Sequence, residues 1–160
     1  MKRLFIYLIL SSVICGCSFY SFSPKGRSTI SSISIERFKN NTNEFGLEDQ
    51  MTDQIIDALI ADGNLKIVPV ENAEAVLSGT LTTYERKPYN PDENDQVESY
   101  SIRMLFNIQL TNRTDNTAIW KDNINRIGIY NLETETEEDG QARAIQLLVD
   151  DIVEKTTKSW

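Results

Sequence analysis

The chain has 160 residues and a formal net charge of −8, and it contains no histidine. Without histidine it lacks the commonest general base and the commonest zinc and copper ligand, and a Ser-His-Asp or Cys-His catalytic site is excluded. The acidic balance gives no general attraction to nucleic acid. We therefore expect a protein of one domain without a cofactor or metal ion, in which any catalysis would have to rely on carboxylates, lysine or tyrosine.

The N-terminus has the organisation of a bacterial lipoprotein signal. A basic start is followed by an apolar run over residues 4–14, which is too short to anchor stably across a bilayer. Residues 14–17 read Ile-Cys-Gly-Cys, the order that lipoprotein processing requires: a branched apolar residue, two small residues and the modified cysteine. We expect residues 1–16 to be removed as a signal peptide and lipid to be attached to Cys17.

Lipidation of Cys17 has three consequences. Acyl chains hold the protein on a membrane, because each buried lipid CH₂ contributes about 0.8 kcal/mol. The other cysteine leaves with the signal, so no thiol remains for a disulfide, a metal ion or catalysis. The mature chain of 144 residues has a charge of about −10, because both basic residues of the signal are lost.

The rest of the chain divides into a tether and one domain. Residues 17–28 are serine-rich and are expected to form the lipidated tether, and residues 29–160 are expected to form the domain. Ser18 follows the cysteine, where an aspartate would indicate retention in the inner membrane. The expected location is therefore the periplasmic side of the outer membrane.

The first half of the domain alternates between strand and helix signals. A β-branched run over residues 30–38 predicts a strand, and residues 40–43 predict a turn with side chains suited to cap a helix. Apolar residues at helical spacing predict a helix over residues 46–61, ended by Gly63 as a left-handed cap. Residues 65–70 predict a short strand that a proline confines to an edge.

A strand over residues 76–84 comes next, in which Gly79 marks a bulge or a close backbone approach. Residues 86–98 contain two prolines and many polar side chains, which predicts a long exposed hairpin loop.

Two long strands and a helix complete the domain. Residues 100–110 alternate between apolar and polar side chains, which predicts a strand with one face on the core. A second strand is predicted over residues 117–130, an acidic loop over residues 133–140 and an amphipathic helix over residues 141–158. The order predicts an α+β two-layer sandwich: a four- or five-stranded mixed sheet with both helices on one face. The first strand and the strand after the first helix are expected to run parallel.

Several segments share their order and spacing with a known family. They are Cys17 followed by Tyr20-Ser21-Phe22, Ile33-Ser34-Ile35 with Phe38 to Thr42, the helix with Leu47, Met51-Thr52 and Ala58-Leu59, Ala75 to Leu81 leading to Tyr84, and the strand from Tyr100 that ends before Trp120. The chain thereby resembles the LptE family of lipopolysaccharide-assembly lipoproteins. The resemblance implies a non-enzymatic plug, one copy in each LptD-like outer-membrane β-barrel, that assists assembly of the barrel and delivery of lipopolysaccharide to the outer leaflet.

The resemblance also implies contact with lipopolysaccharide through basic side chains near loop ends, because arginine and lysine bind phosphate groups. The candidates here are Arg86, Lys87, Arg103, Arg113 and Lys121. The alternative is that these side chains are solvated charges that balance nearby carboxylates, and the mature charge of about −10 favours that alternative. Charge reversal at Arg86 and Lys87 is expected to weaken lipopolysaccharide binding and to leave folding intact.

Two other functions remain open. One is a periplasmic lipoprotein that binds a different envelope complex, as a cell-wall synthase activator or a secretion-channel component, since the fold alone does not decide. The other is a hydrolase that uses Asp49, Asp53 and Asp57, although the same spacing is typical of an exposed helix face. A hydrolase would need a cleft and a raised carboxylate pKa. The acidic run over residues 133–139 lacks the ligand spacing of a calcium loop.

Overall fold

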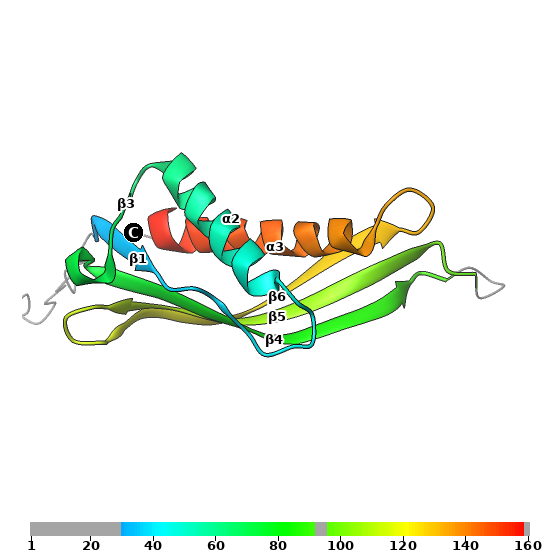
Figure 1. The fold of residues 1–160 in the computed structure, drawn as a ribbon, viewed down its shortest axis with the longest axis horizontal. Coiled ribbons are helices and arrows are strands. Elements are labelled where there is room, and N and C mark those ends of the chain that lie inside the picture. Colours follow the sequence, from blue (N-terminus) through cyan, green and yellow to red (C-terminus); the bar gives the residue numbers. More distant parts are fainter. Residues whose placement is uncertain (1–29, 92–95, 159–160) are drawn as a thin grey trace, which may run out of the picture.

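The computed structural model describes residues 30–91 and 96–158, so that the expected signal, the tether and Cys17 lie outside the described residues. The sheet and its two helices are shown in Figure 1. In chain order the elements are β1 (Ser32–Ile35), β2 (Lys39–Asn40), α2 (Leu47–Asp62), β3 (Lys66–Ile67), the 3₁₀ turn η1 (Val70–Asn72), β4 (Ala75–Tyr89), β5 (Ser99–Asn112), β6 (Ala118–Asn131), α3 (Glu137–Val153) and the π-helical η2 (Glu154–Lys158).

The sheet is mixed, and its order is β3-β1-β4-β5-β6, with β2 beside β4. β1 runs parallel to both β3 and β4, whereas β4, β5 and β6 are antiparallel neighbours. Figure 1 shows α2 and α3 on the same face of this sheet. The predicted α+β sandwich is thus confirmed, with the short β2 as a sixth strand, and the predicted parallel pair is β1 and β3.

The core lies between that face and the helices. The alternating residues of β5 point into it and are fully or almost fully buried: Ile102, Met104, Phe106, Ile108 and Leu110. The helices contribute their predicted apolar faces, with the buried residues Leu47, Met51, Ile55, Leu59, Ile145, Leu148, Val149 and Ile152. Each such side chain contributes about 1.5–3 kcal/mol when it is fully buried, and this burial holds the domain together.

The predicted strand over residues 30–38 is wrong in its extent, because it breaks between β1 and β2. The backbone N–H of Phe38 donates to Thr52 Oγ1 at 2.9 Å instead of pairing with a strand. The Phe38 ring then packs on Gly79, where an added Cβ would lie 2.1 Å from the ring. Gly79 is therefore approached by a side chain and not by backbone, and the register shift falls not at Gly79 but between Leu81 and Thr83.

The predicted hairpin loop over residues 86–98 is also wrong at its start, whereas its predicted end at residue 98 is confirmed. β4 continues to Tyr89, so that the polar residues from Arg86 onward pair with β5, which begins at Ser99. Within the part of the chain that the structure describes, no strand pairs with the other side of β4 beyond Leu81. An edge strand tolerates Pro88 because its missing N–H breaks no sheet bond there. Cross-strand contacts described below compensate for the polarity of this segment.

The helices differ from the sequence prediction in the capping of α2 and in the start of α3. α2 begins after Gly46 with no side-chain cap, because Asn40 Oδ1 instead accepts the N–H of Thr42 at 2.9 Å inside the turn. α3 begins at Glu137, earlier than predicted, because Thr136 and Asp139 form a capping box. The predicted acidic loop is thus largely the first turn of α3, where carboxylates suit the helix dipole. Gly63 ends α2 in the left-handed region as predicted.

Candidate functional site

Both helices lie on one face of the sheet, and no helix of residues 30–91 and 96–158 covers the opposite face (Figure 1). In β5 the residues between the buried ones, from Arg103 to Gln109, point to this opposite face and are partly or fully exposed. We call it the uncovered face. Because side chains of a strand alternate between the two faces of a sheet, it consists of every second residue of each strand, those between the residues that point into the core.

Charge is segregated between the two layers. α2 contains five acidic residues and no basic residue, a formal charge of −5, and α3 contains five acidic residues and one arginine, a formal charge of −4. On the uncovered face the register places five cations, Lys39, Lys66, Lys87, Arg103 and Lys121, and the carboxylate of Glu85. The carboxylate of Glu36 lines a hollow on the same face. The acidity of the domain therefore belongs largely to the helical layer, and the uncovered face is positive.

A shallow hollow of about 240 Å³ lies on the uncovered face, between Lys39 of β2 and Lys121 of β6. We call it the central hollow. Its lining residues are Glu36, Lys39, Ser78, Gly79, Thr80, Asn107, Ile108, Gln109 and Lys121. Neither lysine forms a salt bridge within the described residues. The hollow thus combines two ammonium groups and one carboxylate with hydroxyl and amide side chains, and the ammonium groups suit a phosphate group while the polar side chains suit a sugar.

A second basic group surrounds Glu85 on the same face. Its carboxylate accepts a hydrogen bond from Arg103 at 2.7 Å and lies 2.9 Å from the Lys87 ammonium. These hydrogen bonds, first that of Arg103 and then that of Lys87, lower the pKa of Glu85 to about 2. Lys87, Arg103 and Glu85 together carry one net positive charge. This group is separate from the central hollow, because about 20 Å of strand lies between Arg103 and Gln109.

Arg86 lies on the other face of the sheet, among aromatic side chains. Its guanidinium carbon is 3.6 Å from the ring centroid of Tyr100, and its Nε donates to Tyr130 Oη at 2.6 Å. Nε also lies 3.3 Å from a Glu137 carboxylate oxygen at the start of α3. Arg86 thus joins the sheet to α3 and is not part of the uncovered face.

Tyr84 belongs to the same network. Its hydroxyl donates to Glu137 at 2.5 Å and accepts from Gln141 at 2.9 Å. Burial raises the pKa of Tyr84, and the bond to Glu137 raises it further. The register shift after Leu81 turns Tyr84 and Arg86 inward, and sequence reasoning missed this network because nothing in the local pattern indicates the shift.

Arg113 lies at the opposite end of the sheet from Arg103, in the turn between β5 and β6. Its Nε donates to the carbonyl of Ala73 at 2.8 Å, and its backbone N–H donates to Glu74. Ten residues of β5 separate it from Arg103, a span of about 33 Å. The five basic candidates therefore occupy four separate places, and only Lys87 and Arg103 form one group.

The structure gives no support to the carboxylate hydrolase. Asp49 forms a salt bridge with Arg37 at 2.6 Å, and that hydrogen bond lowers the pKa of Asp49, whereas catalysis would need it raised. Among residues 30–91 and 96–158, no cluster of three or more acidic or cysteine side chains is arranged to hold a metal ion. No helix of that part of the chain has the length and apolarity needed to cross a bilayer.

Solved structures with the same fold come from several bacteria. They include the hypothetical protein CT253 from Chlamydia trachomatis, with a TM-score of 0.60 and 11% identity over 79% of this chain and 95% of that one. The PelC dodecamer from Paraburkholderia phytofirmans has a TM-score of 0.53 and 15% identity over 79% and 87%. A putative lipoprotein from Caulobacter crescentus CB15 has a TM-score of 0.51 and 14% identity over 76% and 88%. At these identities the likeness shows the fold alone.

Family membership rests on the sequence. No curated protein matches the chain significantly. The model of the LptE family, described as lipopolysaccharide-assembly, matches residues 30–156, which is nearly the whole described domain. This match confirms the resemblance found in the sequence, and the chain belongs to the LptE family of lipopolysaccharide-assembly proteins.

Proposed function

We propose that this protein is an outer-membrane lipoprotein, anchored through Cys17, that occupies the lumen of an LptD-like β-barrel as a single copy. It assists assembly of the barrel and helps deliver lipopolysaccharide to the outer leaflet, and it performs no catalysis. Membership of the LptE family over residues 30–156 supports this role. A small sandwich with a polar surface also suits the wide polar lumen of a large outer-membrane barrel.

The positive uncovered face is the observation that carries the proposal. A net charge of about −10 for the mature chain argues against lipopolysaccharide binding only if the charge is spread evenly over the surface. In this fold it is not, because α2 and α3 together carry a formal charge of −9. Lys39 and Lys121 flank the central hollow, which Glu36 also lines. Neither lysine forms a salt bridge among the described residues, so that both are available to phosphate groups. The central hollow is the proposed lipopolysaccharide contact, with Lys87 and Arg103 as a secondary one.

The barrel is tested by co-purification. The tagged full-length protein is purified from detergent-solubilised outer membranes, and a large β-barrel is expected in a near-equal amount. Recovery with a cell-wall synthase or a secretion channel would instead support the alternative function. The fold leaves that alternative open, because the PelC dodecamer shares it.

The lipid contact is tested with paired neutral variants. The double variant Lys39→Gln/Lys121→Gln removes the ammonium groups of the central hollow, and Asp53→Asn/Asp57→Asn removes two charges from α2 as the matched control. The first is expected to weaken binding of purified lipopolysaccharide about tenfold, because two charge-assisted contacts are lost, while the second binds as wild type. Equal affinity in both would remove the central hollow from the proposal.

A further inference from the structure

β6 is one of the two edge strands of the sheet formed by the described residues, so that half of its backbone groups point away from β5. The odd-numbered residues from Asn123 to Asn131 have this outward orientation, because residues of a strand alternate in the direction of their N–H and C=O groups. An open strand edge of this kind attracts other strands unless side chains block it.

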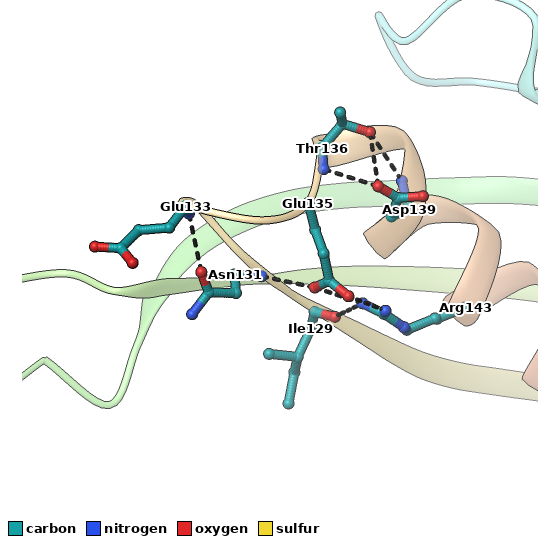
Figure 2. A network of polar contacts seen from close by, with 7 residues as sticks. All are labelled: Ile129, Asn131, Glu133, Glu135, Thr136, Asp139 and Arg143. Atoms are coloured by element: carbon teal, nitrogen blue, oxygen red, sulfur yellow. Dashed lines mark hydrogen bonds and ion pairs between the residues drawn. The ribbon is translucent and has the colours of Figure 1, made fainter.

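One end of the outward edge is blocked by a salt bridge between α3 and the loop before it. Figure 2 shows the Arg143 guanidinium between the backbone carbonyl of Ile129 and the carboxylate of Glu135. The same carboxylate accepts the backbone N–H of Asn131 at 2.8 Å. Hydrogen bonding by Arg143, and then by the Asn131 N–H, lowers the pKa of Glu135 to about 2, so that this block stays charged near neutral pH.

Further along β6, side chains of the strand itself block the outward edge. Asp122 accepts the backbone N–H of Asn123 at 2.8 Å. The guanidinium of Arg126 donates to the carbonyl of Asn125 at 2.7 Å and also forms a salt bridge with Asp151 of α3. Blocks therefore lie on both sides of residue 127.

Between these blocks lies an opening, which we call the edge window. Within the described residues, both backbone groups of Ile127 and the N–H groups of Asn125 and Ile129 have no hydrogen-bond partner. An apolar recess of about 410 Å³ adjoins it, lined by Ile127, Gly128, Ile129, Arg143, Gln146 and Leu147. Ile127 and Leu147 are 46% and 44% exposed, although both are large apolar side chains.

We propose that the edge window is a docking site for an extended segment of a partner protein, which adds a short strand to β6. A second extended backbone satisfies the N–H and C=O of Ile127 together, and about four residues span the distance from Asn125 to Ile129. One face of the added strand packs against Leu147 and the other lies beside the Ile127 side chain. The segment is therefore apolar in its centre.

The charges at the two ends of the window define the partner further. In both flanking salt bridges the arginine is more exposed than the carboxylate: 34% against 20% for Arg126 and Asp151, and 48% against 29% for Arg143 and Glu135. An incoming chain thus meets guanidinium groups, which favour acidic residues at the ends of its apolar centre.

A second copy of this chain fits the window less well. In a two-fold antiparallel pair centred on Ile127, Asn125 of one copy would face Ile129 of the other. The blocking guanidinium groups of Arg126 and Arg143 would then meet across the interface as like charges, which opposes the pairing.

Proline substitution tests the edge window without removing a bond to β5. Ile127→Pro deletes an outward N–H, which an edge strand tolerates. Asn123→Pro is the matched control, because its outward N–H already belongs to Asp122. Thermal unfolding of both variants checks that each is folded before binding is measured.

The decisive measurement is made on the complex with the barrel. This experiment therefore rests on the proposed function, which supplies the barrel as the partner. The amides of residues 127 and 129 are expected to exchange hydrogen about tenfold more slowly in the complex than in the isolated protein. Ile127→Pro is expected to reduce recovery of the barrel about tenfold, and Asn123→Pro to leave it unchanged. If the barrel co-purifies but these amides stay fast, or if both variants recover it equally, the edge-window proposal is overturned and the proposed function stands.

A peptide probe decides the matter if no barrel co-purifies, an outcome that would refute the proposed function. A fluorescent peptide of sequence Asp-Val-Thr-Val-Asp is titrated with the full-length protein, and its anisotropy is followed. Binding that Ile127→Pro removes and Asn123→Pro retains supports the edge window. Absence of binding, or equal binding by both variants, overturns it.

Discussion

Gly128 sets how closely α3 approaches the sheet, and its replacement gives the sharpest test of the packing. A Cβ at this position in β6 would lie 1.8 Å from the carbonyl oxygen of Gly140 and 3.0 Å from the amide nitrogen of Ala144. Both neighbours are backbone atoms of α3, so that no side-chain rotation relieves the clash. Gly128→Ala therefore forces the first turns of α3 away from β6.

The expected cost follows from overpacking. Forcing an extra carbon into a well-packed contact costs about 1–3 kcal/mol of the free energy of unfolding. For a domain of this size that corresponds to a fall in Tm of about 3–12 °C. The assay is urea and thermal unfolding of the full chain, followed by circular dichroism.

Gly63→Ala provides the comparison. No atom lies within 4 Å of a Cβ at residue 63, but the residue has φ +71°, so that alanine there is strained by about 1–2 kcal/mol without any clash. Only Gly128→Ala is expected to loosen α3 and to speed hydrogen exchange in its first turns. A Gly128→Ala protein within about 0.5 kcal/mol of wild type would refute the close docking of α3 on β6.

Three further predictions concern single side chains. Because the folded-state pKa of Glu85 is lowered from 4.5 to about 2, its stabilising contribution is complete above pH 4.5 and is lost as the pH falls toward 2. Thermal unfolding should therefore show a larger fall in Tm over that range for wild type than for Glu85→Gln, and parallel curves would contradict it. Thr136→Ala removes the cap of α3 and should lower the free energy of unfolding by about 1 kcal/mol, whereas Thr114→Ala, in the exposed hairpin turn, should change it little in the same urea titration. Cys17→Ser should abolish acylation and release the protein from membranes; intact mass and fractionation check this, and an unmodified wild-type Cys17 would contradict the lipoprotein assignment.

Sequence periodicity succeeded where one pattern ran through a whole element. Alternation from Ile102 to Leu110 predicted β5 and its buried face, and helical spacing placed the start of α2 within one residue of Leu47. It failed at polar segments that become ordered only through partners far along the chain. The residues after Tyr84 look like a loop, yet the contact of Arg86 with Tyr100 and that of Glu85 with Arg103 extend both strands.

The candidate site shows the same division. The sequence identifies which residues are basic, but the face of a strand depends on its register, and one shift after Leu81 turns Arg86 toward α3 while Lys87 stays on the uncovered face. Lys39 gave no local signal of a site. Lys39 and Lys121 line the same hollow only because their strands, β2 and β6, are joined through β4 and β5 in one sheet.

By itself the sequence determined the expected lipoprotein signal, the absence of histidine chemistry, the α+β class and the family, because composition, local motifs and periodicity are properties of neighbouring residues. The tertiary structure alone decided the separation of an acidic helical layer from a basic sheet face and the location of the unpaired backbone at Ile127. Both depend on register and strand order, which bring together residues that are distant in the chain.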